Sequence, residues 1–437
     1  MRRAVALGIP RTMRDTIFAL SSGAPPAAIA VIRISGPDAA DTLHRLAGRV
    51  PAERRAVTAT LKDAADAVLD RALVLWLPGP ATATGEDIAE LHLHGGRAVV
   101  AAVEAALGQL RGLRRAEPGE FTRRAFANGR IDLAEAEGLA DLLVAETELQ
   151  RQSALAMAGG TFSRIIAAWR DMVLILSAQI EVVLDFADED DVAALPESFT
   201  WNIAALRAEI ATWLSRPRAE ALREGIRIVL AGPPNAGKST LFNALVEADA
   251  AITAPTAGTT RDVLSRPVAI GGVPFLFLDT AGLRDSSTDA IELIGVDRAR
   301  SELARADLVL WLGPEDECPS SAWDIAAQAD RPNMPPKANP RHRVSALTGT
   351  GLADLRADLV ATARTLLPKP GEAALNSRQH RLIGDAEQAL ATALQLTDPL
   401  LVAENLRLAR VAFDALLGRT TTEDMLDTLF SRFCIGK

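Results

Sequence analysis

The chain has 437 residues, 49% of them hydrophobic, and a formal net charge of −9 at pH 7. This size and composition predict about three cored domains and exclude a disordered or fibrous protein. The acidic charge argues against a polyanion-binding surface over the whole molecule but is compatible with a local basic patch. Two cysteines, Cys318 and Cys434, stand far apart in unlike contexts. They favour a reducing compartment, the cytoplasm, over a disulfide framework.

The apolar stretch near the N-terminus does not predict a membrane segment, and neither does the most apolar helical stretch. The run over residues 4–9 is too short for a signal peptide, and we interpret it as an extension, with Met13 as an alternative start. The helix expected over 165–186 is interrupted by charged residues, so it is amphipathic rather than membrane-spanning.

Residues 15–129 have the pattern of a small α/β domain. Strands are expected at 28–36, 71–77 and 88–94, and helices at 37–46 and 97–110. In the strand 88–94, alternation with leucines puts Glu90, His92 and His94 on one face. A metal site is one interpretation of this face, but no further ligand is evident in the sequence, and we favour the wall of a polar pocket.

From about residue 131 the apolar residues recur with helical spacing, through 222 and again over 377–396 and 400–417. The acidic run 185–191 is interpreted as a solvated loop rather than a cation site. In the simplest architecture the late helices pack on the early ones, and the segment between them is an inserted domain. Two separate helical units would give the same pattern.

A phosphate-binding loop opens that inserted segment. Gly-Pro-Pro-Asn-Ala-Gly-Lys-Ser over 232–239 follows the apolar strand 226–230 and precedes a helix. The glycines let backbone N–H groups surround the β-phosphate. Lys238 is placed to reach the β- and γ-phosphates, and the Ser239 hydroxyl to ligate Mg²⁺. This loop predicts a nucleoside triphosphate site.

Two further elements indicate a GTPase-type domain. Asp279-Thr280-Ala281-Gly282 leaves a buried strand, so that Asp279 reaches Mg²⁺ through water and the Gly282 N–H meets the γ-phosphate. Thr260, in Gly-Thr-Thr-Arg-Asp over 258–262, completes the Mg²⁺ shell.

The groups that promote hydrolysis differ from those of Ras-like enzymes. Leu283 stands where these carry a glutamine that orients water, and no arginine finger is evident. Asn235 offers an oxygen for a monovalent cation in place of that finger, with Arg261 and Arg284 as competitors. Glu292 and Asp285 are the carboxylates within reach of the attacking water.

Recognition of guanine is only partly encoded. The expected Asn-Lys-x-Asp is absent, and Ala327-Gln328-Ala329-Asp330 keeps only the carboxylate that accepts from guanine N1 and N2. The loop at 344–347 offers the Ala346 N–H for guanine O6. The stretch 312–330 is poor in strand formers, so this side of the domain is expected to be eroded. We therefore expect weak GTP binding. The binding free energy should be less favourable by about 1–3 kcal/mol if nothing replaces the missing asparagine and lysine.

Specific motifs lie outside the nucleotide elements: Arg-Ile-Ser-Gly at 33–36, Gly-Glu-Asp at 85–87, the tract 118–137 beginning Pro-Gly-Glu-Phe, and the terminal Cys-Ile-Gly-Lys at 434–437. With these the chain resembles the tRNA modification GTPase family MnmE, also called TrmE, from about residue 15 to its end. The resemblance implies an α/β plus all-α protein. The N-terminal α/β domain is folate-binding-like, and a Ras-like P-loop GTPase domain is inserted in a discontinuous helical domain. The expected bounds are 13–130 for the tetrahydrofolate-binding and dimerisation domain, 131–224 and 371–437 for the helical parts, and 225–370 for the GTPase domain.

The resemblance also implies partners and chemistry. It implies a cytoplasmic homodimer that works with the FAD protein MnmG in a heterotetramer or larger complex. Such proteins add an aminomethyl-type (carboxymethylaminomethyl) group to C5 of the wobble uridine of certain tRNAs, using 5,10-methylene-tetrahydrofolate or 5-formyl-tetrahydrofolate. GTP hydrolysis would depend on K⁺ and Mg²⁺.

By position, folate contacts would come from Arg33, Glu90, Arg130 and Lys437, and catalysis from Glu292 and Cys434. For Cys434 a buried structural thiol is the alternative. Mg²⁺ would be held by Ser239 and Thr260, and K⁺ by Asn235, Ala254, Thr256 and Thr259. The expected GTP contacts are Asn235, Ala236, Gly237, Lys238, Ser239, Thr240, Thr259, Thr260, Asp279, Thr280, Ala281, Gly282, Asp330, Ser345, Ala346 and Leu347.

Two other functions are compatible with part of the sequence. An Era-like ribosome-assembly GTPase would account for the central domain but not for the N-terminal motifs or the terminal tetrapeptide. A folate-binding scaffold with a decayed nucleotide site is suggested only by the weak base-recognition segment.

Overall fold

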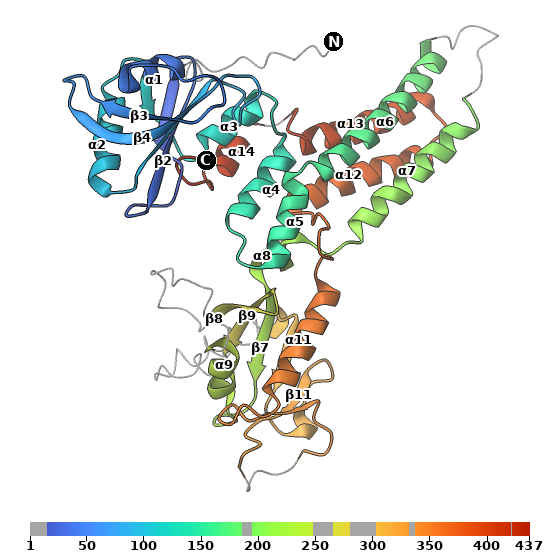
Figure 1. Cartoon of the computed structure of the whole chain (residues 1–437). Coiled ribbons are helices and arrows are strands. Elements are labelled where there is room, and N and C mark those ends of the chain that lie inside the picture. Colours follow the sequence, from blue (N-terminus) through green and yellow to red (C-terminus); the bar gives the residue numbers. More distant parts are fainter. Residues whose placement is uncertain (1–14, 186–194, 248–264, 280–302, 332–336, 421) are drawn as a thin grey trace, which may run out of the picture. The chain divides into compact units, whose positions relative to one another are not determined.

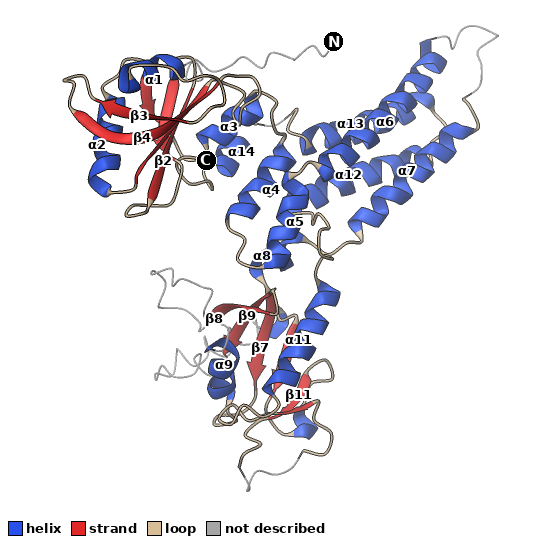
Figure 2. Ribbon diagram, in the orientation of Figure 1, coloured by secondary structure: helices blue, strands red, loops and turns tan. Residues whose placement is uncertain are grey.

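The computed structural model describes residues 15–185, 195–247, 265–279, 303–331, 337–420 and 422–437. The chain forms two compact units, one of Met1–Ala140 with Asp414–Lys437 and the other of Asp141–Phe413. Within its described residues, no helix is both long and apolar enough to span a membrane. Figures 1 and 2 show the elements of each unit.

The first unit is built on a six-stranded sheet in the order β3-β4-β5-β2-β1-β6, in which only β1 and β6 pair in parallel. The strands are β1 (Thr16–Leu20), β2 (Ile29–Ser35), β3 (Val57–Lys62), β4 (Val68–Leu77), β5 (Ile88–His94) and β6 (Leu113–Arg115). The helices are α1 (Ala39–Ala47), α2 (Arg97–Gly108), α3 (Glu120–Ala127), the start of α4 (Leu133–Leu143) and α14 (Glu423–Phe430). The strands expected over 28–36, 71–77 and 88–94 and the helices expected over 37–46 and 97–110 are all present.

Alternation along the strands gives this sheet two different faces. Ala30, Ile32 and Ile34 of β2 are buried in one core with residues of α1 and α2. The opposite face carries Ile17 and Ala19, which pack with Ala116 and Phe121. Because Ala19 pairs with Arg33 in the β1–β2 register, the side chain of Arg33 belongs to this second face.

The C-terminal segment completes the same unit. Phe430 and Phe433 pack with Leu133 and Ala136 in one apolar cluster. A Cβ on Gly119 would lie 2.2 Å from the Phe430 carbonyl oxygen, so α3 and α14 approach as closely as glycine allows. Phe430 and Phe433 are therefore buried in the first unit, to which the segment Asp414–Lys437 belongs.

The second unit contains long helices that pack around aromatic side chains. They are α5 (Glu148–Ala158), α6 (Thr161–Asp185), α7 (Ser198–Leu214), α8 (Ala219–Glu224), α12 (Ser377–Ala393) and α13 (Pro399–Leu416). Trp169 lies 6.3 Å from Trp213 and 6.0 Å from Phe413, between ring centroids. Helix α7 packs against α12, and Arg207 pairs with Glu387 at 2.6 Å. Helices from before and after the inserted segment thus share one layer.

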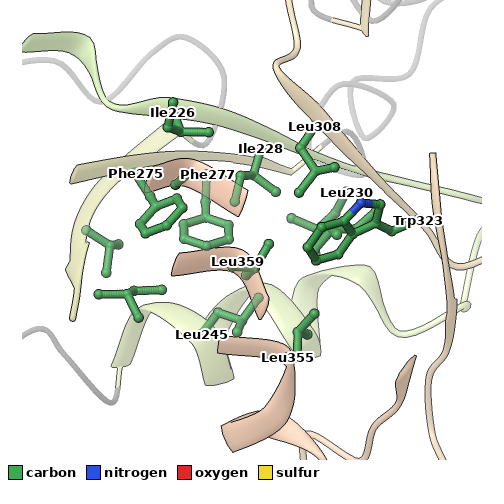
Figure 3. Packing of buried hydrophobic residues seen from close by; sticks show 14 of the residues in the cluster. Ile226, Ile228, Leu230, Leu245, Phe275, Phe277, Leu308, Trp323, Leu355 and Leu359 are labelled. Carbon is green, nitrogen blue, oxygen red and sulfur yellow. The ribbon is translucent and has the colours of Figure 1, made fainter. Parts of the chain in front are cut away.

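The inserted segment forms a second six-stranded sheet in the order β12-β11-β10-β7-β9-β8, parallel except for the β8–β9 pair. Its elements are β7 (Ile226–Ala231), α9 (Lys238–Glu247), β8 (Ser265–Ile270), β9 (Val273–Asp279), β10 (Leu308–Trp311), β11 (Trp323–Ala326), β12 (His342–Arg343) and α11 (Leu352–Leu366). Figure 3 shows Ile228, Leu230 and Phe277 packed with Leu355 and Leu359 of α11. A parallel sheet with helices against it is a ligand-binding architecture in which sites form at the carboxyl ends of the strands.

Candidate nucleotide-binding site

The loop 232–237 joins the end of β7 to the start of α9, as the sequence predicts. Gly232 has φ +142°, and a Cβ there would lie 2.9 Å from the Gly313 nitrogen. Gly237 has φ +91°. At both positions the left-handed backbone and the close neighbour explain why glycine is required.

Lys238 begins α9 and is 6% exposed. Its Nζ donates hydrogen bonds to the carbonyl oxygens of Gly232, at 2.9 Å, and Pro233, at 2.8 Å. The loop's own carbonyls therefore hold the ammonium at the helix N-terminus, beside Ser239 and Thr240. A positive charge and the helix dipole act together at this point, which favours binding of an anion.

The opposite side of the site is built by the ends of two neighbouring strands, β11 and β12. The Ala329 N–H donates to the Val344 carbonyl at 3.1 Å, which joins the two loops. The Ser345 hydroxyl donates to Asp330 Oδ1 at 2.6 Å and accepts from the Thr348 N–H at 3.1 Å. The hydrogen bond from Ser345 lowers the pKa of the Asp330 carboxyl below its ordinary value, so at neutral pH this group is an ionised acceptor.

This side of the domain is less eroded than the sequence suggested. The stretch 312–330 contains β11, which pairs in parallel with β10 through Leu310 and Trp323. Trp323 is 7% exposed and belongs to the domain core. Four residues suffice for this short strand because burial of Trp323 and Ile325 stabilises it, although their neighbours are poor strand formers.

A pocket lies between the phosphate-binding loop and the two loops that follow β11 and β12. Its lining comes from Gly237, Thr240, Leu241, Ala327, Gln328, Asp330, Arg331, Val344, Ala346 and Leu347. The structure thus brings together residues more than 100 positions apart. Five of them were not among the predicted GTP contacts: Leu241, Ala327, Gln328, Arg331 and Val344. Gln328 and Arg331 are close to Asp330 in the sequence, which could have identified them as site residues. The mismatch of this segment to Asn-Lys-x-Asp concealed that.

Several predicted nucleotide and cation contacts lie outside the described residues. These are Ala254, Thr256, Thr259, Thr260, Thr280, Ala281, Gly282 and Glu292. Asp279 is the last residue of β9, next to β7 in the sheet. The acidic run 185–191 also falls almost entirely outside the described residues.

The first unit contains the residues predicted to bind folate. Arg33 and Glu90 are paired across β2 and β5, and the Arg33 Nε and Nη2 each donate to Glu90 Oε1 at 3.0 Å. The Arg33 guanidinium also lies 5.9 Å from the centroid of the Phe121 ring. His92 Nε2 is 3.3 Å from Glu90 Oε2, whereas the exposed His94 contacts Asp70 at 2.7 Å. Glu90, His92 and His94 do share a face, on which Glu90 and His92 contact each other and His94 contacts Asp70 instead.

The C-terminal tetrapeptide lies against the end of β1. The Ser21 hydroxyl donates to the Gly436 carbonyl at 2.9 Å. Gly436 has φ +95°, and a Cβ there would lie 2.1 Å from the Leu20 carbonyl oxygen. Cys434 is exposed, which differs from the alternative of a buried structural thiol, and Lys437 is half-buried.

Arg130, the remaining predicted folate contact, is exposed at the end of the loop that follows α3. Its N–H donates to the Ala125 carbonyl at 2.8 Å. Its side chain lies along Gly85, where a Cβ would come within 3.2 Å of the Arg130 Cγ. All four predicted folate contacts therefore belong to the first unit.

Comparison with known proteins identifies the family. The model described as the MnmE helical domain matches residues 133–434, and the model described as the GTP-binding protein TrmE N-terminus matches residues 16–130. The chain is 63% identical to the tRNA modification GTPase MnmE of Novosphingobium aromaticivorans, over 97% of this chain and 100% of that protein. It is 62% identical to the protein of that name from Erythrobacter litoralis, over 97% of this chain and 100% of that protein.

Among solved structures, the G domain of the T. maritima FeoB iron transporter is similar, with 26% identity over 32% of this chain and 98% of that chain. The TM-score of this match is 0.24. The two family models and the full-length relatives confirm the resemblance carried by the sequence motifs. The chain belongs to the tRNA modification GTPase MnmE family.

Proposed function

We propose that this protein binds and hydrolyses GTP and uses the hydrolysis in the modification of tRNA. The observation that carries the proposal is the pocket in which the phosphate-binding loop faces Asp330 and Ala346. Phosphate-binding groups on one side and base-reading groups on the other are the two parts that a nucleotide site requires. Membership of the MnmE family supplies the class of reaction.

Asp330 and Ala346 would select guanine. The Asp330 carboxylate accepts hydrogen bonds from guanine N1–H and N2–H, and adenine presents neither donor in that arrangement. Ser345 holds the carboxylate through its 2.6 Å hydrogen bond. The Ala346 N–H would donate to guanine O6. Because the asparagine of Asn-Lys-x-Asp is replaced by Ala327, we expect nucleotide affinity to be weak.

The phosphates would be held at the start of α9. Lys238 would exchange its bonds to the Gly232 and Pro233 carbonyls for bonds to phosphate oxygens. Ser239 and Thr260 would hold Mg²⁺, and the Asn235 side chain with carbonyls of Ala254, Thr256 and Thr259 would hold K⁺. These ligands are all oxygen atoms, the donors that hard cations prefer. Bound there, the cations would neutralise the charge that develops on the phosphates.

Glu292 would orient the attacking water, which Leu283 has no group to do. Its carboxylate would accept a proton or a hydrogen bond from the water and align it with the γ-phosphate. A residue in this role contributes about 10²- to 10⁴-fold to the rate.

The modification itself would take place on the first unit. Arg33, Glu90, Arg130 and Lys437 would bind 5,10-methylene- or 5-formyl-tetrahydrofolate, which supplies the one-carbon unit when bound. Arg33 supplies a cation for a folate carboxylate or ring carbonyl, and Glu90 an acceptor for pterin N–H groups. With the flavoprotein MnmG as partner and as a homodimer in the cytoplasm, the protein would act on C5 of the wobble uridine. Cys434, exposed on the tail, is the candidate thiol for that chemistry.

The decisive experiment measures turnover of GTP and ATP in K⁺ or Na⁺ buffer, for the wild type and the variants Glu292→Ala and Asn235→Gly. Asn235 has φ +61°, so glycine accepts its backbone while removing its side-chain oxygen. We expect K⁺-dependent turnover of GTP, its loss by at least about 10²-fold in Glu292→Ala, and loss of K⁺ stimulation in Asn235→Gly. Absence of turnover, or equal rates for ATP and GTP, would refute the proposal and favour a folate-binding scaffold.

The modification step is tested separately with MnmG, methylene-tetrahydrofolate as the one-carbon donor, glycine as the amine donor, GTP and unmodified tRNA. Mass spectrometry of the digested tRNA should reveal a carboxymethylaminomethyl-type uridine at the wobble position. If the mixture hydrolyses GTP but the tRNA stays unmodified, the proposed role in modification is refuted while the GTPase activity stands.

A further inference from the structure

Two residues in an unusual backbone conformation meet at the candidate nucleotide pocket. Within the described part of the chain, four non-glycine residues have positive φ, and two of them are Asn235, at +61°, and Gln328, at +56°. The Gln328 Nε2 donates a hydrogen bond to the Asn235 carbonyl oxygen at 3.0 Å. The phosphate-binding loop and the base-reading loop are thus joined at a point where both adopt a conformation that side chains disfavour.

The contact between these loops involves the whole Gln328 side chain. A Cβ on Gly237 would lie 3.0 Å from the Gln328 Nε2 and 3.3 Å from its Cγ. Gln328 therefore lies across the phosphate-binding loop next to Gly237, and both residues line the pocket.

The backbone around Gln328 is fixed from the other side. Its carbonyl accepts from the Arg331 N–H at 2.9 Å, and the next residue, Ala329, donates to the Val344 carbonyl at 3.1 Å. A positive φ at a non-glycine residue persists only where the surroundings hold it, and such positions concentrate at binding sites.

This arrangement links the two halves of the pocket. Asp330 is two residues beyond Gln328, so the Gln328–Asn235 hydrogen bond joins the loop that carries Asp330 to the loop that precedes Lys238. Gln328 stands at the lysine position of Asn-Lys-x-Asp, yet it is uncharged. A neutral amide can bridge the loops without adding positive charge beside the base.

We propose that Gln328 is a positioning residue for nucleotide binding, which ties the base-reading loop to the phosphate-binding loop and thereby sets the discrimination by Asp330. The inference rests on the proposed nucleotide-binding function. It also specifies what takes the place of the missing asparagine and lysine: a single neutral hydrogen bond between the loops.

The test compares three variants of the full-length protein by calorimetric titration with GDP and with ADP. Gln328→Met keeps the length of the stem over Gly237 but has no donor for the Asn235 carbonyl. Gln328→Lys restores a donor, and Gln388→Met makes the same substitution at an exposed position on α12. Loss of one neutral hydrogen bond should weaken GDP binding in Gln328→Met about 3- to 10-fold.

A purely structural role would be visible in the ligand-free protein. We expect the melting temperature of ligand-free Gln328→Met to match that of Gln388→Met, while the preference for GDP over ADP falls. Gln328→Lys should recover most of the affinity, because its ammonium reaches the same carbonyl.

Wild-type affinity and preference in Gln328→Met would overturn the inference while leaving nucleotide binding intact. Failure of Gln328→Lys to bind better than Gln328→Met would also overturn it, because the donor would then be irrelevant. A wild-type protein that binds neither GDP nor GTP would remove the proposed function and this inference together.

Discussion

Replacement of the buried Arg124 should destabilise the first unit far more than replacement of its neighbour Arg123. The Arg124 side chain is 1% exposed and donates to the Asp15 carbonyl at 2.8 Å, to Glu120 at 3.0 Å and to Glu86 at 3.1 Å. Arg123, on the same helix, pairs instead with Glu423 and Asp427, whose side chains are 66% and 60% exposed. Two adjacent residues of α3 therefore make ion pairs of different kinds: those of Arg124 are buried and those of Arg123 lie at the surface.

The magnitude follows from what each partner retains. Removing one member of a buried ion pair costs about 3–5 kcal/mol, because a charge is left in a poorly solvated place. In Arg124→Met, Arg114 still donates to Glu120 and to Asp15, so Glu86 alone loses its charged partner while keeping its hydrogen bond from Ser35. This partial compensation favours the lower end, about 3 kcal/mol. Arg123→Met should cost at most about 1 kcal/mol.

Amide hydrogen exchange measures this difference in the intact protein. Peptides from β1 and α3 should exchange about 10²-fold faster in Arg124→Met than in the wild type, under conditions in which they exchange through cooperative unfolding of the first unit. Arg123→Met is the matched control and should exchange within about fivefold of the wild type. Equal effects of the two variants would refute the reasoning that burial decides the cost.

Three further outcomes follow from the contacts described above. Gly436→Ala should displace the C-terminal tail from the Leu20 carbonyl, and carboxypeptidase should then release Lys437 faster; an unchanged rate would contradict this packing. Burial acts to raise the pKa of the Glu120 carboxyl, but the hydrogen bonds from the two arginines and the Glu117 amide outweigh it and lower that pKa below its ordinary value. The carboxylate's contribution to stability is therefore complete above about pH 5 and is lost as the pH falls through the lowered pKa. The urea midpoint of the first unit should fall on acidification, and a midpoint that rises would contradict this reasoning. Ser345→Ala removes the hydrogen bond to Asp330 and should raise the pKa of that carboxyl. The acidic limb of the pH profile of GDP binding should then move to higher pH. An unchanged limb would show that the Ser345 hydroxyl does not act on the carboxylate.

Local patterns in the sequence were sufficient to predict many elements. The strand expected over 88–94 is β5, Ile88–His94, because alternating leucines specify both its conformation and its two faces. The phosphate-binding loop was predictable because its function requires glycines and lysine at set positions between a strand and a helix. Such signals depend on residues that are close together in the sequence.

Base recognition was harder to predict because its residues belong to separate loops. Asp330 was identified from a single matching position, but its hydrogen bond from Ser345 and the bridge from Gln328 to Asn235 depend on how β11 and β12 place their loops. Their side-chain contacts span 15 and 93 positions of the chain. The roles predicted for Glu292, Thr256, Thr259 and Thr260 remain predictions.

The sequence by itself determined the family, the nucleotide-binding loop and the alternation that gives each strand its faces, because these depend on residue types at short spacing. Only the tertiary structure decided which distant groups meet: Arg33 with Glu90 through strand register, Gly436 with Ser21, and the buried Arg124 with three carboxylates. The physical reason is that such contacts depend on how separate elements pack, where burial and hydrogen bonding between remote segments outweigh the preferences of any one of them.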